Sequence, residues 1–144
     1  MVFHILTIFK EFFRGPLDHG VVARARNNGQ VDIRLLDLRD YTSDVHRTVD
    51  GRPFGGDEGM VLRIEPIYKA LKTIRSGWGS KKTRTVLLSA QGRLFDQAVA
   101  RQFSNYEEIA LVCGRYEGVD ERVSENLVDE ELSVGNFVST GGEW

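Results

Sequence analysis

The stretch LVCGRYEG, residues 111 to 118, decides the fold, because an apolar run passes here directly into a polar turn that holds two glycines. The same arrangement occurs earlier in the chain, in VLLSAQG at residues 86 to 92. Short continuous apolar runs of this kind are typical of strands buried on both faces of a parallel sheet. Ligands bind outside the carboxyl ends of such strands, so we expect the two turns to form walls of one site.

The segments around these turns alternate between strand and helix patterns. The predicted strands lie at residues 2 to 9, 31 to 36, 85 to 88 and 109 to 113, and the predicted helices at 20 to 29, 66 to 75 and 94 to 103. This alternation predicts one α/β domain over residues 1 to 144, with a largely parallel sheet and helices on both faces.

Two further segments are rich in glycine. Residues 41 to 60 hold few apolar side chains, and a long loop inside a compact domain is usually functional or disordered. The second segment, SVGNFVSTGGE at 133 to 143, follows an acidic stretch. Together with the two strand-end turns it could close round an adenosine, with backbone groups reading the base and Phe137 or Tyr116 packing on its flat face.

Charge is unevenly distributed along the chain, although the net charge is only −2. Residues 107 to 131 carry nine acidic side chains against two arginines, whereas residues 63 to 101 carry nine basic side chains against two acids. Local field rather than net charge governs the encounter with a polyanion. The pattern is compatible with a face that binds nucleic acid, and equally with two solvated helix faces; Glu107, Glu108 and residues 129 to 131 are most simply read as solvated.

Several classes of protein lack their sequence signals here. The dinucleotide-binding and P-loop glycine patterns are absent, and no metal-ligating spacing occurs, although Glu117 could hold a divalent ion such as Mg²⁺. The single cysteine, Cys113, ends an apolar run and reads as a small buried side chain. The apolar N-terminus reads as a first strand rather than a signal peptide or a membrane span, so we expect a cytoplasmic protein without membrane contact.

Four blocks of the sequence carry a resemblance to a known family. In order along the chain they are HRTVDGRPFGGDEGM (46 to 60), LLSAQGR (87 to 93), LVCGRYEGVDERV (111 to 123) and DEELSVGNFVSTGGE (129 to 143). Together they resemble the signature blocks of the bacterial tRNA (guanine-N1)-methyltransferases, TrmD, across essentially the whole chain. The resemblance implies the SPOUT class of α/β methyltransferase domain, with a deep trefoil knot that periodicity alone would never suggest.

The resemblance also implies a cofactor, S-adenosyl-L-methionine, bent in the knot and held mostly by the backbone of three loops. The positions carried over are Leu88, Ser89 and Gln91 in the first loop, Gly114, Tyr116 and Glu117 in the second, and Val134, Gly135, Asn136, Phe137, Val138, Ser139, Gly141 and Gly142 in the third. These are the loops that the argument from strand ends selects independently.

The implied reaction transfers a methyl group to N1 of the guanine immediately 3′ of the anticodon, position 37 of tRNA. Because N1 carries a proton, a carboxylate base is expected beside it. In the family that base is an aspartate in a segment after the GGE block, beyond Trp144, so no catalytic residue is assigned within this chain.

Contact with tRNA is expected from the glycine-rich segment, at Asp50, Arg52, Gly55, Gly59 and Met60. Departures from the commonest family pattern also stand in these blocks: Ala90 replaces a proline, and Asn136 and Gly51 each replace an aspartate. Asp57 and Glu58 add negative charge where a phosphate backbone could pass.

Family members continue past the GGE block into a helix that completes the knot and a C-terminal tRNA-binding domain, and they act as homodimers. We therefore expect this chain to be a truncated enzyme with an incomplete knot, inactive on its own. Two alternatives stay open: a cofactor- or RNA-binding fragment that transfers no methyl group, and another knotted RNA methyltransferase that acts on ribose or uridine.

Overall fold

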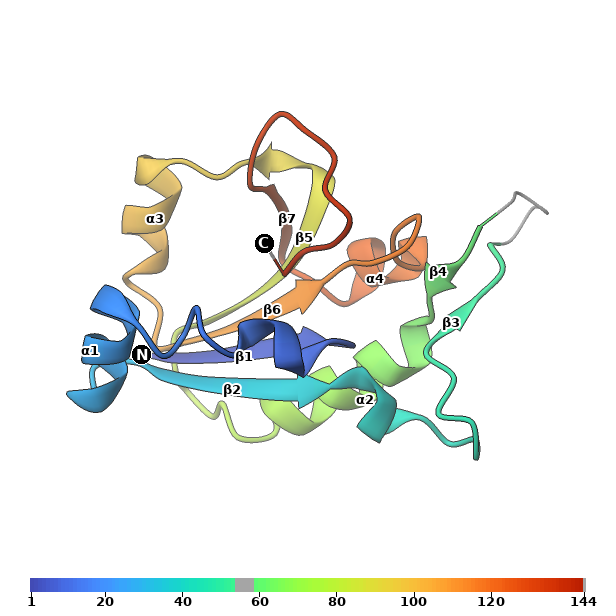
Figure 1. The fold of residues 1–144 in the computed structure, drawn as a ribbon, viewed down its shortest axis with the longest axis horizontal. Helices are drawn as coiled ribbons and strands as arrows, with labels where there is room; N and C mark the ends of the chain where they lie inside the picture. Colours follow the sequence, from blue (N-terminus) through green and yellow to red (C-terminus); the bar gives the residue numbers. More distant parts are fainter. Residues whose placement is uncertain (54–58, 144) are drawn as a thin grey trace.

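The computed structural model describes residues 1–53 and 59–143. Its elements, drawn in Figure 1, are β1 (Val2–Thr7), η1 (Lys10–Phe13), α1 (Gly20–Asn27), β2 (Asp32–Asp37), η2 (Leu38–Tyr41), β3 (Asp50–Gly51), β4 (Val61–Leu62), α2 (Ile64–Arg75), β5 (Thr83–Leu94), α3 (Gln97–Phe103), β6 (Glu108–Cys113), α4 (Glu121–Asn126) and β7 (Glu130–Ser133). No helix among these residues is long and apolar enough to cross a lipid bilayer.

Five strands form one parallel sheet in the order β2-β1-β6-β5-β7, and β3 and β4 form a separate antiparallel pair. Strand β1 lies between two neighbours: Val2 is opposite Asp32 of β2 on one side and opposite Glu108 of β6 on the other. All five carboxyl ends therefore lie at the same edge of the sheet, as the apolar runs predict.

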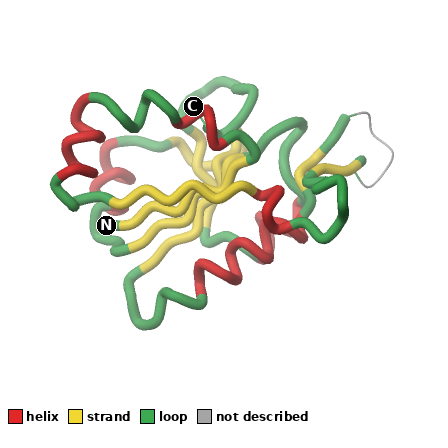
Figure 2. Tube along the Cα trace, turned by 60° about the horizontal axis from the view of Figure 1, so that its bottom comes forward, coloured by secondary structure: helices red, strands yellow, loops and turns green. Residues whose placement is uncertain are grey.

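Helices cover both faces of this sheet (Figure 2). Successive side chains of a strand point to opposite faces, so Leu87 packs with α2 and α4 while its neighbour Val86 packs with α3. The larger cluster is built round Ile67 and Leu71 of α2. The predicted class, an α/β domain with a largely parallel sheet and helices on both faces, is confirmed.

The structure corrects several predicted boundaries. Strand β5 continues through Leu94, and α3 begins only at Gln97, because the carboxylate of Asp96 accepts the backbone N–H of Val99 and caps the helix there. Strand β7 and helix α4 were not predicted, since the acidic stretch that forms them shows no clear apolar period. On α2, Tyr68 is half exposed instead of belonging to the apolar face.

The reading of Glu107, Glu108 and residues 129 to 131 as solvated is wrong for Glu130, whose side chain is 12% exposed and pairs with two arginines. It is also wrong for Glu108, which is only 5% exposed. Its carboxylate accepts a hydrogen bond from the Lys81 ammonium and lies 2.7 Å from Nε2 of His4. Burial raises the pKa of Glu108, but the bonds from Lys81 and His4 outweigh it, so the pKa lies below its usual value. A buried carboxylate is stable when it is paired in this way.

Candidate functional site

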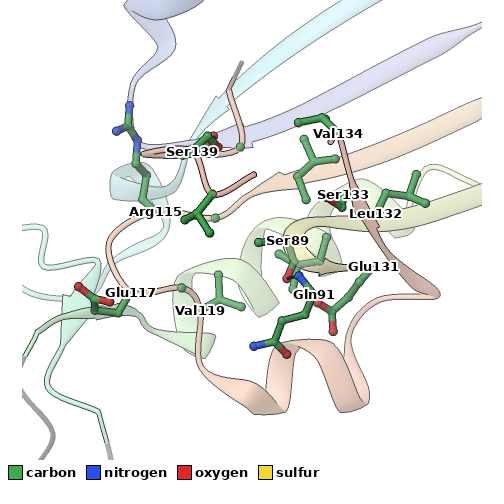
Figure 3. A pocket seen from close by; sticks show the side chains of 18 of the residues that line it. Ser89, Gln91, Arg115, Glu117, Val119, Glu131, Leu132, Ser133, Val134 and Ser139 are labelled. Atoms are coloured by element: carbon green, nitrogen blue, oxygen red, sulfur yellow. Dashed lines mark hydrogen bonds between the residues drawn. The ribbon is translucent and has the colours of Figure 1, made fainter. Parts of the chain in front are cut away.

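A cavity of about 230 Å³ opens at the carboxyl edge of the sheet (Figure 3). The segments that follow β6 and β7, the outer part of β5 and one side of α4 form its walls. It is lined by Leu87, Leu88, Ser89, Ala90, Gln91, Gly114, Arg115, Tyr116, Glu117, Gly118, Val119, Glu121, Ser124, Glu131, Leu132, Ser133, Val134, Phe137, Val138, Ser139, Thr140, Gly141 and Gly142.

The first wall is a bulge within β5 rather than a loop after it. Both Leu88 and Arg93 lie opposite Leu132 of β7, so the four residues between them, 89 to 92, bulge out of the ladder. Gly92 makes this possible: a Cβ there would lie 2.5 Å from the backbone of Glu131 and Leu132. The bulged segment that carries Ser89 and Gln91 is thus held against β7.

The second wall is the turn after β6. The backbone N–H of Gly118 donates to the carbonyl of Arg115 at 3.0 Å, and Tyr116 has a φ of 60°. A non-glycine residue in this left-handed region is uncommon and is often found where a site constrains the backbone. The N–H of Glu117 donates to the carbonyl of Met60 at 3.0 Å, which joins this wall to the glycine-rich segment before β4.

The third wall runs from the end of β7 back to the turn after β6. The backbone N–H of Gly142 donates to the carbonyl of Gly114 at 2.9 Å. A Cβ on Gly142 would come within 3.0 Å of both Cys113 and Leu88, so the backbone here fits closely between the other two walls. Between these anchors, Phe137 and Val138 are exposed.

The charges of the cavity are mostly negative. Glu117, Glu121 and Glu131 line it, and among the described residues Glu131 is held by the hydroxyl of Ser124. Among the described lining residues the one cationic side chain is that of Arg115, which donates from Nε to Glu143 at 3.1 Å. The cavity therefore favours a ligand with positive charge.

Two titratable groups beside the cavity have shifted pKa values. Next to Glu121, the bidentate hydrogen bonds from Arg122 hold the pKa of Asp120 below its usual value. Burial, followed by the nearby carboxylate of Glu143, raises the pKa of the Cys113 thiol well above its normal value. Cys113 is consequently a protonated, unreactive side chain, in agreement with its reading as a small apolar residue.

Most of the cofactor positions carried over from the family resemblance lie together in this cavity. The structure places all of them on its lining except Gly135 and Asn136. Asn136 is exposed, and Gly135 lies under the ring of Phe137, where a Cβ would be 2.1 Å from a ring carbon. Three segments far apart in sequence therefore meet round one space.

The expected tRNA-contact residues lie beside the cavity, not in it. Asp50 belongs to β3, and Gly59 and Met60 lead into β4, in the hairpin that projects past α4 in Figure 1. Arg52 lines a second groove, which shares Val119 and Glu121 with the cavity. Gly55 and Asp57 lie outside the described residues.

Sequence reasoning missed several residues of the cavity. Arg115 stands within the quoted GRYEG block, between two carried-over positions, so the motif itself could have indicated it. Ser124 and Glu131 offered no such signal, because α4 and β7 were not predicted. Among the described residues, no group of three or more His, Cys, Asp or Glu side chains could hold a metal ion.

Residues 1–144 match the model of the family described as tRNA (Guanine-1)-methyltransferase TrmD. A curated tRNA (guanine-N(1)-)-methyltransferase from Koribacter versatilis is 55% identical over 99% of this chain and 55% of its own length. One from Geobacter metallireducens is 47% identical over 99% of this chain and 58% of its own.

A solved structure agrees with the sequence matches. The crystal structure of tRNA (m1G37) methyltransferase from Aquifex aeolicus superposes with a TM-score of 0.88 at 37% identity, covering 99% of this chain and 63% of the solved chain. The chain spans about half the length of the curated relatives it matches. The fold, the sequence blocks and these matches agree, and the chain belongs to the tRNA (guanine-1)-methyltransferase family, TrmD.

Proposed function

We propose that this chain provides the S-adenosyl-L-methionine site of an enzyme that methylates N1 of the guanine at position 37 of tRNA. The observation that carries the proposal is the meeting of three segments, after β6, after β7 and within β5, round one cavity at the carboxyl edge of a parallel sheet. Family membership supplies the reaction class.

The residues present suit this cofactor. Gly114, Gly141 and Gly142 line the cavity with backbone rather than side-chain atoms, and the exposed ring of Phe137 offers a flat apolar surface for a purine. The three lining carboxylates complement a ligand that carries a sulfonium and an ammonium charge. When bound, the cofactor supplies an activated methyl group, so the protein mainly has to orient it and exclude water.

The tRNA side of the site is assigned to the groove beside the cavity. Arg52 is exposed there, and the groove continues into the cofactor cavity at Val119 and Glu121. A nucleotide held against Arg52 and the β3–β4 hairpin would have its base near the cofactor. We assign Asp50, Gly59 and Met60 to the same contact.

Further properties follow from family membership alone. We infer a knotted cofactor domain over residues 1 to 144, a homodimeric assembly and a cytoplasmic location. Sedimentation equilibrium of the purified protein tests the assembly: a mass twice that of the chain is expected, and a monomer at micromolar concentration contradicts it.

Two measurements test the proposed function. Calorimetric titration with S-adenosylmethionine is expected to give micromolar affinity, about −8 kcal/mol. Methyl transfer is then measured with radiolabelled cofactor on a tRNA transcript with guanine at position 37 and on a matched transcript with adenine there. Label on the first transcript alone, recovered as 1-methylguanosine, supports the proposal.

The other results separate the alternatives. Cofactor binding without transfer favours a binding module over a complete enzyme, and label on ribose or uridine favours another class of RNA methyltransferase. Absence of cofactor binding contradicts the proposed site.

A further inference from the structure

We propose that Thr7, Glu143 and Arg115 act as one chain of positioning residues, which holds the third wall of the cavity in the shape that receives the cofactor. Thr7 and Glu143 do not line the cavity, so their effect on binding would be indirect. The inference rests on the proposed function, because the wall that they hold is a wall of the proposed cofactor site.

Thr7 begins this chain at the carboxyl end of β1. Its side chain is fully buried, and its hydroxyl donates to Oε1 of Glu143 at 2.7 Å. The same hydroxyl accepts the backbone N–H of Phe9 at 2.9 Å. Since that N–H occupies an acceptor site of the oxygen, the hydroxyl proton is directed to Glu143.

Glu143 links Thr7 to Arg115. Its side chain is 0% exposed, and its second oxygen, Oε2, accepts from Nε of Arg115 at 3.1 Å. Arg115 also donates from Nη1 to the carbonyl of Thr140 at 2.9 Å, and its guanidinium lies 4.6 Å from the centre of the Phe9 ring. Both oxygens of the buried carboxylate are thus satisfied, as a buried charge requires.

The ion pair lies directly against the backbone of the third wall. A Cβ on Gly141 would come 2.4 Å from Oε2 of Glu143 and 2.5 Å from Nε of Arg115. Gly141 also forms a bridge with Arg115, and Gly142 donates to Gly114. With this close fit, a tilt of the Glu143–Arg115 pair has to move Gly141 and Gly142, both of which line the cavity.

Thr7→Val tests the inference, because valine keeps the shape of threonine and replaces only the hydroxyl with a methyl group. Losing a hydrogen bond to a charged group is expected to weaken S-adenosylmethionine binding about tenfold. Without ligand, the backbone amides of residues 139 to 142 are expected to exchange with deuterium faster, since Gly142 loses its fixed position against Gly114. Calorimetry and hydrogen exchange with mass spectrometry measure the two effects.

Thr85→Val is the matched control. Like Thr7, Thr85 is a fully buried strand threonine outside the cavity lining, but its hydroxyl bonds Arg75 rather than Glu143. Its substitution is expected to lower the unfolding midpoint without changing cofactor affinity or exchange at residues 139 to 142. If both variants lost cofactor affinity equally, the inference would be overturned, because the loss would reflect general destabilisation.

The exchange measurement keeps the inference separate from the proposed function. If the wild-type protein does not bind S-adenosylmethionine, the proposed function fails, and unchanged exchange in Thr7→Val then independently refutes the positioning role. Should Thr7→Val not fold, Arg115→Lys replaces it: an ammonium cannot bond Glu143 and Thr140 together as the guanidinium does, so the same faster exchange is expected.

Discussion

Gly92 is a position where one added methyl group has a large predicted effect. Its Cα lies against β7, and a Cβ would meet backbone atoms of Glu131 and Leu132 at 2.5 Å, where no flexible side chain can yield. Gly92→Ala is therefore expected to lower the free energy of unfolding by roughly 1–3 kcal/mol, as overpacking does. Urea denaturation measures the change.

Gly77→Ala is the control for this substitution. The nearest atom to a Cβ at Gly77 is the carbonyl oxygen of Ile74 at 3.6 Å, an ordinary contact. Its unfolding curve should match that of the wild-type protein or shift to slightly higher stability. An equal loss in both variants would show that the close approach of β5 to β7 is not the cause.

Phe137 is expected to matter for binding rather than for stability. Its side chain is 61% exposed at the mouth of the cavity, so truncation removes little buried surface. Phe137→Ala is predicted to weaken S-adenosylmethionine binding by about 1 kcal/mol, the usual worth of an aromatic contact, with an unchanged unfolding midpoint. Val45→Ala, at a residue 95% exposed and outside the cavity lining, should change neither quantity. If Phe137→Ala bound S-adenosylmethionine as tightly as the wild-type protein, Phe137 would not contact the cofactor.

At the scale of elements, the pairing of β5 with β7 depends on one carboxylate. Glu130 of β7 accepts hydrogen bonds from Arg84 and Arg93, which stand on either side of the β5 bulge. Burial raises the pKa of Glu130, but these two bonds outweigh it, so the pKa lies below the ordinary value of 4.5. A carboxylate with a lowered folded pKa stabilises the protein above its unfolded pKa and loses that contribution as pH falls through the folded pKa.

Glu130→Gln is therefore expected to be less stable than the wild-type protein at neutral pH and to approach it as pH falls below about 4.5. Thermal unfolding midpoints across this acid range measure the convergence. Glu125→Gln, at an exposed position of α4, should run parallel to the wild-type curve throughout. If the difference in unfolding midpoint between Glu130→Gln and the wild-type protein stayed constant with pH, the charge of Glu130 would not be the source of the stabilisation.

The elements also show what the sequence can and cannot predict. Strands with continuous apolar runs, such as β1 and β6, were found within one or two residues, and α2 was found from its apolar period. Strand β7 (EELS) was missed because acidic side chains begin it, and the arginines that pair with Glu130 lie some forty residues earlier in the chain. Such pairing is a tertiary property that local patterns do not contain.

In the candidate site, too, residues set by local sequence patterns could be predicted, whereas those set by tertiary contacts could not. Residues at strand ends, such as Ser89 and Gly114, could be selected from apolar runs that pass into polar turns. Glu143 was quoted within its block but given no role, because its partner Thr7 is 136 residues away. The bulge in β5 was equally invisible, since it depends on the approach of β7 to Gly92.

On the scale of the whole molecule, the carboxyl and amino edges of the sheet differ in structure. The carboxyl edge holds the open cavity, whereas at the amino edge His4 and Glu108 form a buried pair, which the partly exposed Lys81 joins from the surface. Ligand binding should therefore protect the carboxyl edge selectively, and Cys113, the single cysteine of the chain, lies there.

Cys113 is predicted to report on opening of the molecule. Because its thiol is buried and its pKa is raised, it should react with a thiol reagent at least about a hundredfold more slowly in the native protein than in concentrated urea. S-adenosylmethionine should slow the native reaction further, since Gly142 packs against Cys113. Reaction as fast as in urea would contradict the burial, and a rate indifferent to the cofactor would place its site elsewhere.

The position of β1 between β2 and β6 has a consequence for synthesis on the ribosome. Strand β1 can pair with β2 early, but its other neighbour, β6, begins only at Glu108, and Glu143, the partner of the Thr7 hydroxyl, is synthesised later still. At about 5–20 residues per second, β6 is synthesised on the order of 10 seconds after β1. Through that interval the nascent chain carries one unpaired edge of a largely apolar strand, which is the kind of surface that chaperones protect from aggregation.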